Sequence, residues 1–305
     1  MSRRELDAAG ITEAGLRASY EVCRRLNAEH GKTYYLATRL LPAGKRPYVH
    51  ALYGFARYVD EIVDDLQSTL TDRERADTLR RWSDRFLADL QRGYSAHPVA
   101  SAVIDTVQRW HIPHQHFAAF LHSMAMDLTV REYATYEDLY EYVYGSAAVI
   151  GLQMVPILEP ANDAAYPRAV DLGLAFQLAN FVRDVGEDLD RGRLYLPLDE
   201  MAEFGVRREE LERRIVDEPI RRLLAYQVAR VRRLEQASRP GIELLDPTSR
   251  PCIEAARVLY CGIVDEVERI DYQVFDRRAI VPTARRLAVA LPAWGLAVRT
   301  RRRSA

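Results

Sequence analysis

The sequence predicts an all-α protein. Apolar residues recur at the three- and four-residue spacing of an amphipathic helix along almost the whole chain. Alternating β-branched runs bounded by turn residues, which indicate strands, are missing from the sequence. The expected helices cover Thr12–Glu29, Thr33–Leu41, Tyr48–Leu66, Asp72–Arg92, Pro98–Trp110, His114–Leu128, Tyr136–Leu158, Pro167–Asp188, Glu218–Leu245, Arg250–Ile270 and Pro282–Val298.

Proline and glycine delimit these elements in chain order. Pro42 separates the second helix from the third, and Gly93 follows the fourth. Pro113 precedes the sixth helix, Pro160 follows the seventh, and Gly192 follows the eighth. The sequence contains neither an internal repeat of the length of a solenoid unit nor a low-complexity linker.

Composition limits the functions open to the chain. A chain of 305 residues that is 48% hydrophobic can bury a large core, and we expect one domain over residues 1–305. The 43 Lys and Arg residues nearly balance the 44 Asp and Glu residues, which argues against a nucleic-acid partner. The three cysteines lack metal-type spacing, and no apolar targeting segment follows Met1. These features predict a cytoplasmic protein.

Four polar residues of the apolar segment Phe176–Asp190 lie on one stripe of a predicted helix. Gln177, Asn180, Asp184 and Asp188 follow one another at intervals of three or four residues, so their oxygen atoms form a column. Apolar neighbours surround the upper half of this column, where uncompensated carboxylates are costly or become protonated. We therefore expect a positive partner nearby.

A second acidic pair lies on the third predicted helix. Asp60 and Asp64 are four residues apart among apolar neighbours, and Arg57 and Tyr53 precede them on nearby faces. One such pair is usually a solvated surface feature, but two pairs walled by apolar residues indicate a shared site. If the two helices face each other, the carboxylates and Asn180 form an all-oxygen cage of the kind that Mg²⁺ prefers.

An all-oxygen cage beside an apolar cavity suits the ionisation of an allylic diphosphate. Metal ions and arginines neutralise the leaving diphosphate, and the apolar wall keeps the carbocation away from water. The sequence offers no Ser or Cys nucleophile constellation and no nicotinamide-binding fingerprint.

Two segments resemble the signature motifs of the squalene and phytoene synthase family. They are DEIVD at Asp60–Asp64, preceded by Arg57, and NFVRDVGEDLDRGRLYLP at Asn180–Pro197. HGKTYYLATRLLP near the N-terminus, YVYGSAAVIG in the middle and LYCGIVDEVERIDYQVFDRRAIVP near the C-terminus also resemble family segments in the expected order. The resemblance therefore spans nearly the whole chain, and within the family it is similar to the bacterial phytoene synthases.

The resemblance implies an isoprenoid-synthase helical bundle with a central cavity. It also implies a transferase reaction of carotenoid biosynthesis, in which two molecules of geranylgeranyl diphosphate are joined head to head. Prephytoene diphosphate, a cyclopropyl compound, is the intermediate, and 15-cis-phytoene is the product. Both half-reactions begin with the loss of a diphosphate, so one metal site serves twice.

The resemblance also assigns roles by matched position. The implied ligands of Mg²⁺, for which Mn²⁺ is an alternative, are Asp60, Asp64, Asn180, Asp184 and Asp188. The implied substrate-binding residues are His30, Thr33, Arg57, Gln177, Asn180, Tyr260 and Arg278. The four aspartates are also catalytic, together with Tyr53 and Tyr142, whose rings match tyrosines near the reacting carbons. No nicotinamide cofactor is implied.

Departures from the family pattern leave alternatives open. The segment YGSAAVIG stands where many relatives have a Gly-Thr-Val-Gly turn, so Ala148 takes a small-residue position and Ile150 adds bulk near the cavity. A C15 substrate, giving presqualene diphosphate or dehydrosqualene, is therefore one alternative. A class I terpene cyclase and a chain-elongating prenyltransferase are others. A non-catalytic relative is also an alternative, although every expected acidic ligand is present.

The C-terminal segment has two interpretations. Leu287–Val298, LAVALPAWGLAV, is either a packed last helix or a membrane-docking element, and the basic run Arg299–Ala305 is either a frayed tail or a contact with anionic lipid heads. A hydrophobic substrate and product imply work at a membrane surface without spanning it. The longest uncharged run, Tyr142–Leu158, is shorter than the ~20 residues of a spanning helix, so we expect a core helix there.

Overall fold

The computed structural model describes residues 3–64 and 70–303, apart from the side chains at positions 32, 33 and 64. The helices, in chain order, are α1 (Arg3–Ala8), α2 (Ala14–His30), α3 (Lys32–Thr38), α4 (Arg46–Asp64), α5 (Asp72–Arg92), α6 (Pro98–Trp110), α7 (Gln115–Thr129), α8 (Tyr136–Val143), the π-helix η1 (Tyr144–Ala148), α9 (Val149–Ile157), α10 (Ala165–Asp190), α11 (Leu198–Glu203), α12 (Arg208–Glu212), α13 (Glu218–Glu243), α14 (Arg250–Cys261), α15 (Ile263–Arg269) and α16 (Thr283–Arg303).

The all-α prediction is confirmed. Across residues 3–64 and 70–303 the only β-type pairing is an isolated bridge between Glu132 and Leu194. Helices α5 and α6 begin and end at the predicted residues. Thr71 and Glu74 form a capping box at the start of α5, and Gly93 ends this helix in the left-handed conformation. The predicted end of the third helix, Leu66, lies outside the described residues.

The prediction of one helix over Tyr136–Leu158 is wrong, because a π-helical turn separates α8 from α9. A Cβ atom on Gly145 would lie 2.1 Å from Oγ of Ser123, and one on Gly173 would lie 2.8 Å from the carbonyl oxygen of Ala147. The wider turn therefore fits where α7 and α10 approach η1 closely. The side chains of α9 are mostly buried, as expected for a core helix. Within the described residues, no helix combines the length and the apolar character that a membrane crossing requires.

Two further boundaries differ from the prediction. The single helix expected over Arg250–Ile270 breaks at Gly262, where a Cβ atom would lie 2.6 Å from the carbonyl oxygen of Val258. Helix α16 continues to Arg303, so a frayed tail beginning at Arg299 is also wrong as far as residue 303. The short helices α1, α11 and α12 were not predicted, because they span too few turns to produce a hydrophobic period.

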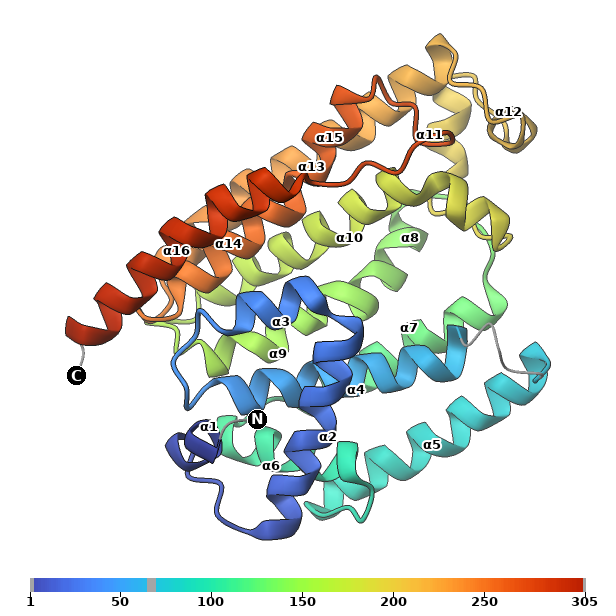
Figure 1. Cartoon of the computed structure of the whole chain (residues 1–305). Coiled ribbons are helices and arrows are strands. Elements are labelled where there is room, and N and C mark those ends of the chain that lie inside the picture. Colours follow the sequence, from blue (N-terminus) through green and yellow to red (C-terminus); the bar gives the residue numbers. More distant parts are fainter. Residues whose placement is uncertain (1–2, 65–69, 304–305) are drawn as a thin grey trace.

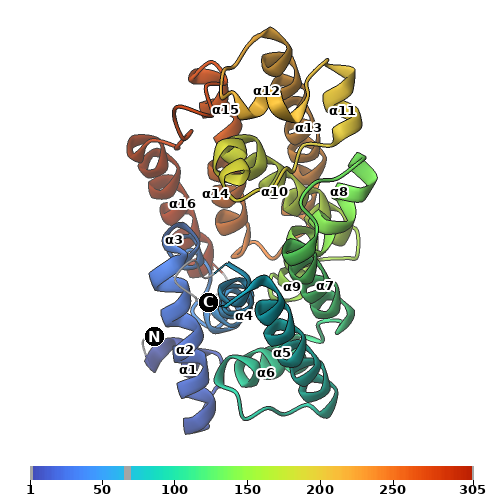
Figure 2. The same ribbon diagram turned by 90° about the vertical axis from the view of Figure 1, so that its right-hand side faces the viewer.

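Helix α10 lies at the centre of the bundle (Figure 1), where it packs against α13, α9 and η1. One cluster of buried apolar side chains joins α2, α4, α5, α6, α7 and α9, and a second joins α8, α10, α13 and α15. Figure 2 shows these two sets of helices one above the other. Val170 of α10 and Tyr144 of η1 pack against both clusters. On this basis we propose that the whole chain forms a single domain.

The direction of α4 and α10 positions the candidate site. Both helices run the same way in Figure 1, and the end-on view in Figure 2 agrees. Their C-terminal ends, which carry the two acidic pairs, therefore lie on the same side of the molecule. Helices α3, α9 and α14 also surround the space between α4 and α10. Both helices are therefore partly covered by other helices.

Candidate active site

A cavity of about 220 Å³ lies between α10 and the surrounding helices α3, α9, α13 and α14. Most of its lining is apolar, and glycine and alanine on α9 and α10 keep it open. Ser146 and Ala147 of the π-helix also line it, so the turn that sequence analysis missed shapes the wall. Gln177 and Asn180, both predicted site residues, line the cavity at its end nearest the acidic pair of α10.

The acidic pair of α10 is held among arginines. Nε of Arg183 donates to Oδ1 of Asp184 at 2.7 Å, and its Nη2 donates to Oδ2 of the same carboxylate. Nη2 of Arg278 lies 3.2 Å from Oδ1 of Asp184, and Nη1 of Arg278 lies 3.3 Å from Glu187. The carboxylate of Asp184 is therefore compensated by two cations, which is the positive partner that the sequence led us to expect.

Asp188, one turn further along α10, is compensated less well. Burial, and then the negative charge of Asp184, raise the pKa of Asp188 to about 7. Arg191 and Arg193 act in the opposite direction but do not offset these effects. At neutral pH this carboxyl is thus about half protonated in the absence of further positive charge, which indicates a place for a cation.

The acidic end of α4 has a similar arrangement. Nη1 of Arg57 donates to Oδ2 of Asp60 at 2.6 Å, and its Nε lies 3.3 Å from Oε1 of Glu61. Nε2 of His30, at the end of α2, lies 3.4 Å from the same oxygen of Glu61. The structure thus brings three predicted residues together around Glu61, which was not predicted. The side chains of Thr33 and Asp64 lie outside the described residues.

A row of four aromatic rings connects the two acidic helices. The ring of Tyr53 on α4 lies 5.8 Å from that of Tyr34 on α3, between ring centroids. Tyr34 lies 4.9 Å from Tyr260 on α14, and Tyr260 lies 4.9 Å from Phe176 on α10. Burial raises the pKa of the Tyr34 hydroxyl to about 12 and that of Tyr260 well above its ordinary value. These hydroxyls therefore stay neutral, and they can donate hydrogen bonds to an anion.

Tyr142 lies in the core beside Asp127, and its predicted catalytic role stays a prediction. Its hydroxyl donates to Oδ2 of Asp127 at 2.8 Å, and the hydroxyl of Tyr195 donates to Oδ1 of the same carboxylate at 2.8 Å. Tyr142 is buried and is not among the residues that line the central cavity. Its predicted catalytic role therefore has no support from this geometry. Asp127 was not predicted, because it lies 15 residues from Tyr142 in a different helix.

A second pocket, of about 300 Å³, adjoins the acidic pair of α10. Arg183, Arg278 and Arg286 line it together with Tyr260. Sequence analysis missed Arg183 and Arg286, although Arg183 stands between Asn180 and Asp184 in the quoted motif. Three guanidinium groups in one pocket suit a polyvalent anion such as diphosphate.

The comparisons with known proteins agree with this geometry. A family profile described as squalene/phytoene synthase matches residues 27–285. The chain belongs to the squalene/phytoene synthase family. A phytoene synthase of Arthrospira platensis is 37% identical over 282 residues, which cover 88% of this chain and 90% of that protein. A 15-cis-phytoene synthase of Synechococcus elongatus is 36% identical over 286 residues, which cover 90% of this chain and 92% of that protein.

Solved structures of the family have the same fold. The crystal structure of a dehydrosqualene synthase in complex with a ligand matches with a TM-score of 0.83 at 26% identity, covering 92% of this chain and 96% of that one. A squalene synthase from Alicyclobacillus acidocaldarius matches with a TM-score of 0.79 at 26% identity, covering 87% and 98%. The predicted isoprenoid-synthase bundle is therefore confirmed.

Divalent metal is implied by the family, and the donor set of this chain fits it. Among the described residues no three His, Cys, Asp or Glu side chains form a ready metal cluster. The site does, however, hold three oxygen donors on α10. Asn180 lies on the cavity wall, Asp184 lies one turn further on, and the raised pKa of Asp188 shows that nearby cations do not fully compensate its carboxylate. Oxygen donors with unmet negative charge are what Mg²⁺ requires. The predicted set of five ligands stays a prediction.

The raised pKa of Asp188 predicts a pH-dependent stability in metal-free protein. Because the pKa of about 7 in the folded state lies above the ordinary value of 3.8, the folded state holds a proton that the unfolded chain releases. Stability contributed by this group is thus fully present below about pH 4 and is lost as the pH rises to 7. Asp188→Asn lacks this titrating group, so it does not lose this stability. The difference in unfolding free energy, Asp188→Asn minus wild type, should therefore be larger at pH 8 than at pH 5 by on the order of 2 kcal/mol.

Urea unfolding in the presence of EDTA at the two pH values measures this difference. Asp190→Asn is the matched control, since Asp190 is an exposed carboxylate on the same helix. This control should leave the pH dependence of wild type unchanged. Equal pH dependence in Asp188→Asn and wild type would contradict the assigned environment of Asp188.

Proposed function

We propose that this protein is a phytoene synthase, which joins two molecules of geranylgeranyl diphosphate to 15-cis-phytoene. The observation that carries the proposal is that α10 bears an acidic pair at one end and the wall of an apolar cavity along the rest of its length. The relatives at 36% and 37% identity carry the names 15-cis-phytoene synthase and phytoene synthase over nearly their whole length. Carotenoid biosynthesis is the process to which this reaction belongs.

The reaction proceeds in two half-reactions at one site. In the first, one substrate loses its diphosphate, and its C1 bonds to the C2–C3 double bond of the other substrate, with loss of a proton, to give prephytoene diphosphate. In the second, this intermediate loses the remaining diphosphate, the cyclopropane rearranges, and loss of a proton gives phytoene. Each half-reaction requires a stabilised leaving group and a cation kept from water.

The arginines and tyrosines bind the diphosphates in this proposal. Arg57, Arg183 and Arg278 now neutralise the carboxylates of the site, and each can turn its remaining donors to phosphate oxygens. Tyr34 and Tyr260 supply neutral hydroxyl donors beside them. The faces of these rings and of Tyr53 also offer electron density to the carbocation.

Mg²⁺ is the metal that we propose for the site, with Mn²⁺ as a substitute. Asp60, Asp184, Asp188 and Asn180 would hold it, joined by Asp64 from the end of α4. When bound, the metal neutralises charge on the leaving diphosphate. In this proposal the aspartates contribute to catalysis by holding the metal against the diphosphate.

The length of the cavity favours a C20 substrate. Residues that line it run along α10 from Asn180 to Ala165, which is about 22 Å at the rise of an α-helix. An extended chain of four isoprene units requires a channel of this order. The walls are apolar and carry small side chains at Gly151, Ala169 and Gly173, which suit a slender hydrocarbon.

We propose further that the enzyme works in the cytoplasm at the surface of a membrane. Both the substrate tails and the product are hydrocarbons with little solubility in water. Binding without spanning would give the enzyme access to both.

The first test of the function is the metal requirement. Purified protein incubated with geranylgeranyl diphosphate should yield a C40 triene only when Mg²⁺ is present, as measured by mass and ultraviolet analysis of the extract. Asp60→Ala and Asp184→Ala should each lower turnover at least about 100-fold, because each removes a group that holds charge opposite the leaving diphosphate. Far-ultraviolet circular dichroism should remain unchanged.

Asp190→Ala is the control for this test, since its side chain is exposed beyond the acidic pair. It should retain turnover within about a factor of two. Turnover that survives both Asp60→Ala and Asp184→Ala would overturn the assigned roles. A C30 product from farnesyl diphosphate in preference to the C40 product would replace the proposed substrate with the C15 alternative.

The second test concerns chain length. Ala169 lines the cavity about two turns from Gln177 along α10, and the larger side chain in Ala169→Leu would shorten the channel. We expect kcat/KM for geranylgeranyl diphosphate to fall by about 10-fold or more, with a smaller loss for farnesyl diphosphate. Ala202→Leu, at an exposed position on α11, is the control for the added volume. An equal loss of kcat/KM for both substrates would contradict the proposal that Ala169 limits the chain length the cavity accepts.

A further inference from the structure

We propose that the outward face of α16, together with its basic C-terminal turn, docks this protein on an anionic lipid bilayer. This inference rests on the proposed function, because an enzyme with hydrocarbon substrates and product has a reason to bind a membrane. The new element is the surface that makes the contact. We define the α16 face as Leu287, Leu291 and Trp294 and the basic turn as Arg299 to Arg303.

The α16 face is a single apolar stripe that the described part of the chain leaves more than half exposed. Leu287, Leu291 and Trp294 stand at positions i, i+4 and i+7, so they share one side of the helix. Their exposed fractions are 53%, 64% and 58%. In the described residues, eleven large apolar side chains are exposed. Three of these form the α16 face, and a fourth, Leu296, lines the groove on the other side of the helix. Scattered exposed leucines are ordinary, but this concentration on one helix marks an interaction surface.

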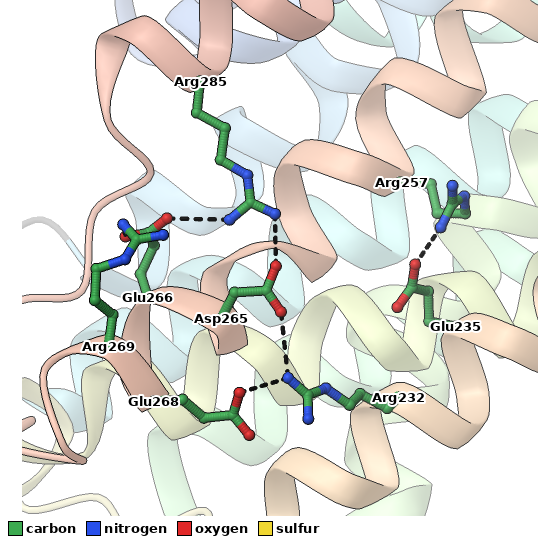
Figure 3. Close-up of polar contacts among 8 residues, drawn as sticks. All are labelled: Arg232, Glu235, Arg257, Asp265, Glu266, Glu268, Arg269 and Arg285. Atoms are coloured by element: carbon green, nitrogen blue, oxygen red, sulfur yellow. Dashed lines mark hydrogen bonds and ion pairs between the residues drawn. The ribbon is translucent and has the colours of Figure 1, made fainter.

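The opposite side of α16 is packed in part, with Ala297 fully buried, so the exposure is not that of a detached helix. Val289, Ala293 and Ala297 follow one another at four-residue intervals and contact the first core cluster. Arg285 in the first turn donates to Asp265 at 2.5 Å and to Glu266 at 3.1 Å on α15, as Figure 3 shows. Helix α16 thus lies along α14 (Figure 1) and is tied to α15 by Arg285, while the side chains of the α16 face stay more than half exposed.

The charge of this segment selects an anionic partner. Residues 277–305 contain eight arginines and no acidic residue, whereas the whole chain has a net charge of −1. Four of these arginines belong to the basic turn, and Arg302 continues the stripe of Leu287, Leu291 and Trp294. Basic residues beside leucine and tryptophan are typical of helices that lie in the plane of a membrane interface.

The space beneath α16 is also apolar for the most part. A groove of about 610 Å³ lies between α16 and α14. The apolar residues on its α16 side are Ala288, Val289, Pro292, Ala293 and Leu296, so Val289 and Ala293 are only partly covered. Glu243, Arg250 and Glu254 are the charged residues among its lining. Hydrocarbon chains therefore find apolar surface on two sides of the same helix.

A second copy of this chain fits the α16 face less well than a bilayer. A twofold contact through this face would bring together two helices that both carry arginines and no acidic side chain. Such a contact lacks the opposite charges that would stabilise it. Anionic lipid heads supply those charges at every position around the basic turn.

Flotation with vesicles tests the proposal. Full-length protein is mixed with vesicles of phosphatidylcholine alone or with a quarter phosphatidylglycerol. We expect binding to the anionic vesicles that falls as salt screens the charges. Leu291→Glu should lower the partition coefficient at least about 10-fold, because it places a charge at the centre of the apolar stripe. Ile215→Glu, at an exposed apolar residue between α12 and α13, is the matched control and should bind as wild type does.

Tryptophan fluorescence gives a second readout of the same contact. Trp294 is the exposed tryptophan, while Trp82 and Trp110 pack against the first core cluster. Anionic vesicles should shift the emission of wild type to shorter wavelength, and this shift should be absent in Trp294→Phe. A shift that persists in Trp294→Phe would overturn the proposed surface.

The outcomes separate this inference from the proposed function. Turnover of substrate in detergent micelles should be the same in Leu291→Glu as in wild type, because the residue lies outside the active site. If turnover is normal and wild-type protein does not bind anionic vesicles, the docking proposal fails alone. Loss of a dimer in Leu291→Glu, measured by analytical ultracentrifugation without lipid, would assign the face to a second copy and would also overturn the proposal. Absence of turnover with binding intact would refute the function instead.

Discussion

The burial of two carboxylates one turn apart on α10 is the constraint on which the rest of the site depends. Asp184 and Asp188 stand one turn apart in surroundings that solvate charge poorly. Arg183 and Arg278 compensate Asp184, whereas burial, and then the charge of Asp184, raises the pKa of Asp188 to about 7. The structure therefore holds a deficit of positive charge next to an apolar cavity. Metal ions bound together with a diphosphate would supply this positive charge.

The central position of α10 places the acidic pair next to the apolar cavity. One rigid helix of 26 residues carries the acidic pair and also the wall against which a hydrocarbon chain can lie. The charged end and the apolar end of one substrate are thus positioned by the same element. The arginines of the site already occupy the carboxylates, so they can exchange these partners for phosphate oxygens without a large movement of the backbone.

The helices and the polar column on α10 were predictable from sequence, because both depend on helical periodicity. The spacing of Gln177, Asn180, Asp184 and Asp188 predicts one column, and the structure places the first two on the cavity wall. Periodicity also predicts most helices, since a buried stripe repeats every three to four residues whatever its neighbours are. Family resemblance added partners from distant parts of the chain, such as Arg278, which lies between α15 and α16 and 94 residues beyond Asp184.

Other features depend on contacts that sequence patterns do not report. The π-helix at Tyr144–Ala148 arises where Gly145 and Gly173 let neighbouring helices approach, and a local pattern contains no such information. Tyr142 occupies a helical position suited to the cavity, but a hydrogen bond to Asp127 on α7 holds it in the core. The exposure of Leu291 on α16 is likewise a property of packing, since its sequence pattern also fits a buried helix.

Diffraction at the manganese absorption edge tests the central claim most directly. Crystals grown with Mn²⁺ and an unreactive thio-analogue of geranylgeranyl diphosphate would locate the metal by its anomalous signal. The account predicts metal ions bound to the diphosphate and to oxygen atoms of Asp184 and Asp188 on one side and of Asp60 on the other. A diphosphate held by arginines alone, with no metal at these carboxylates, would contradict it.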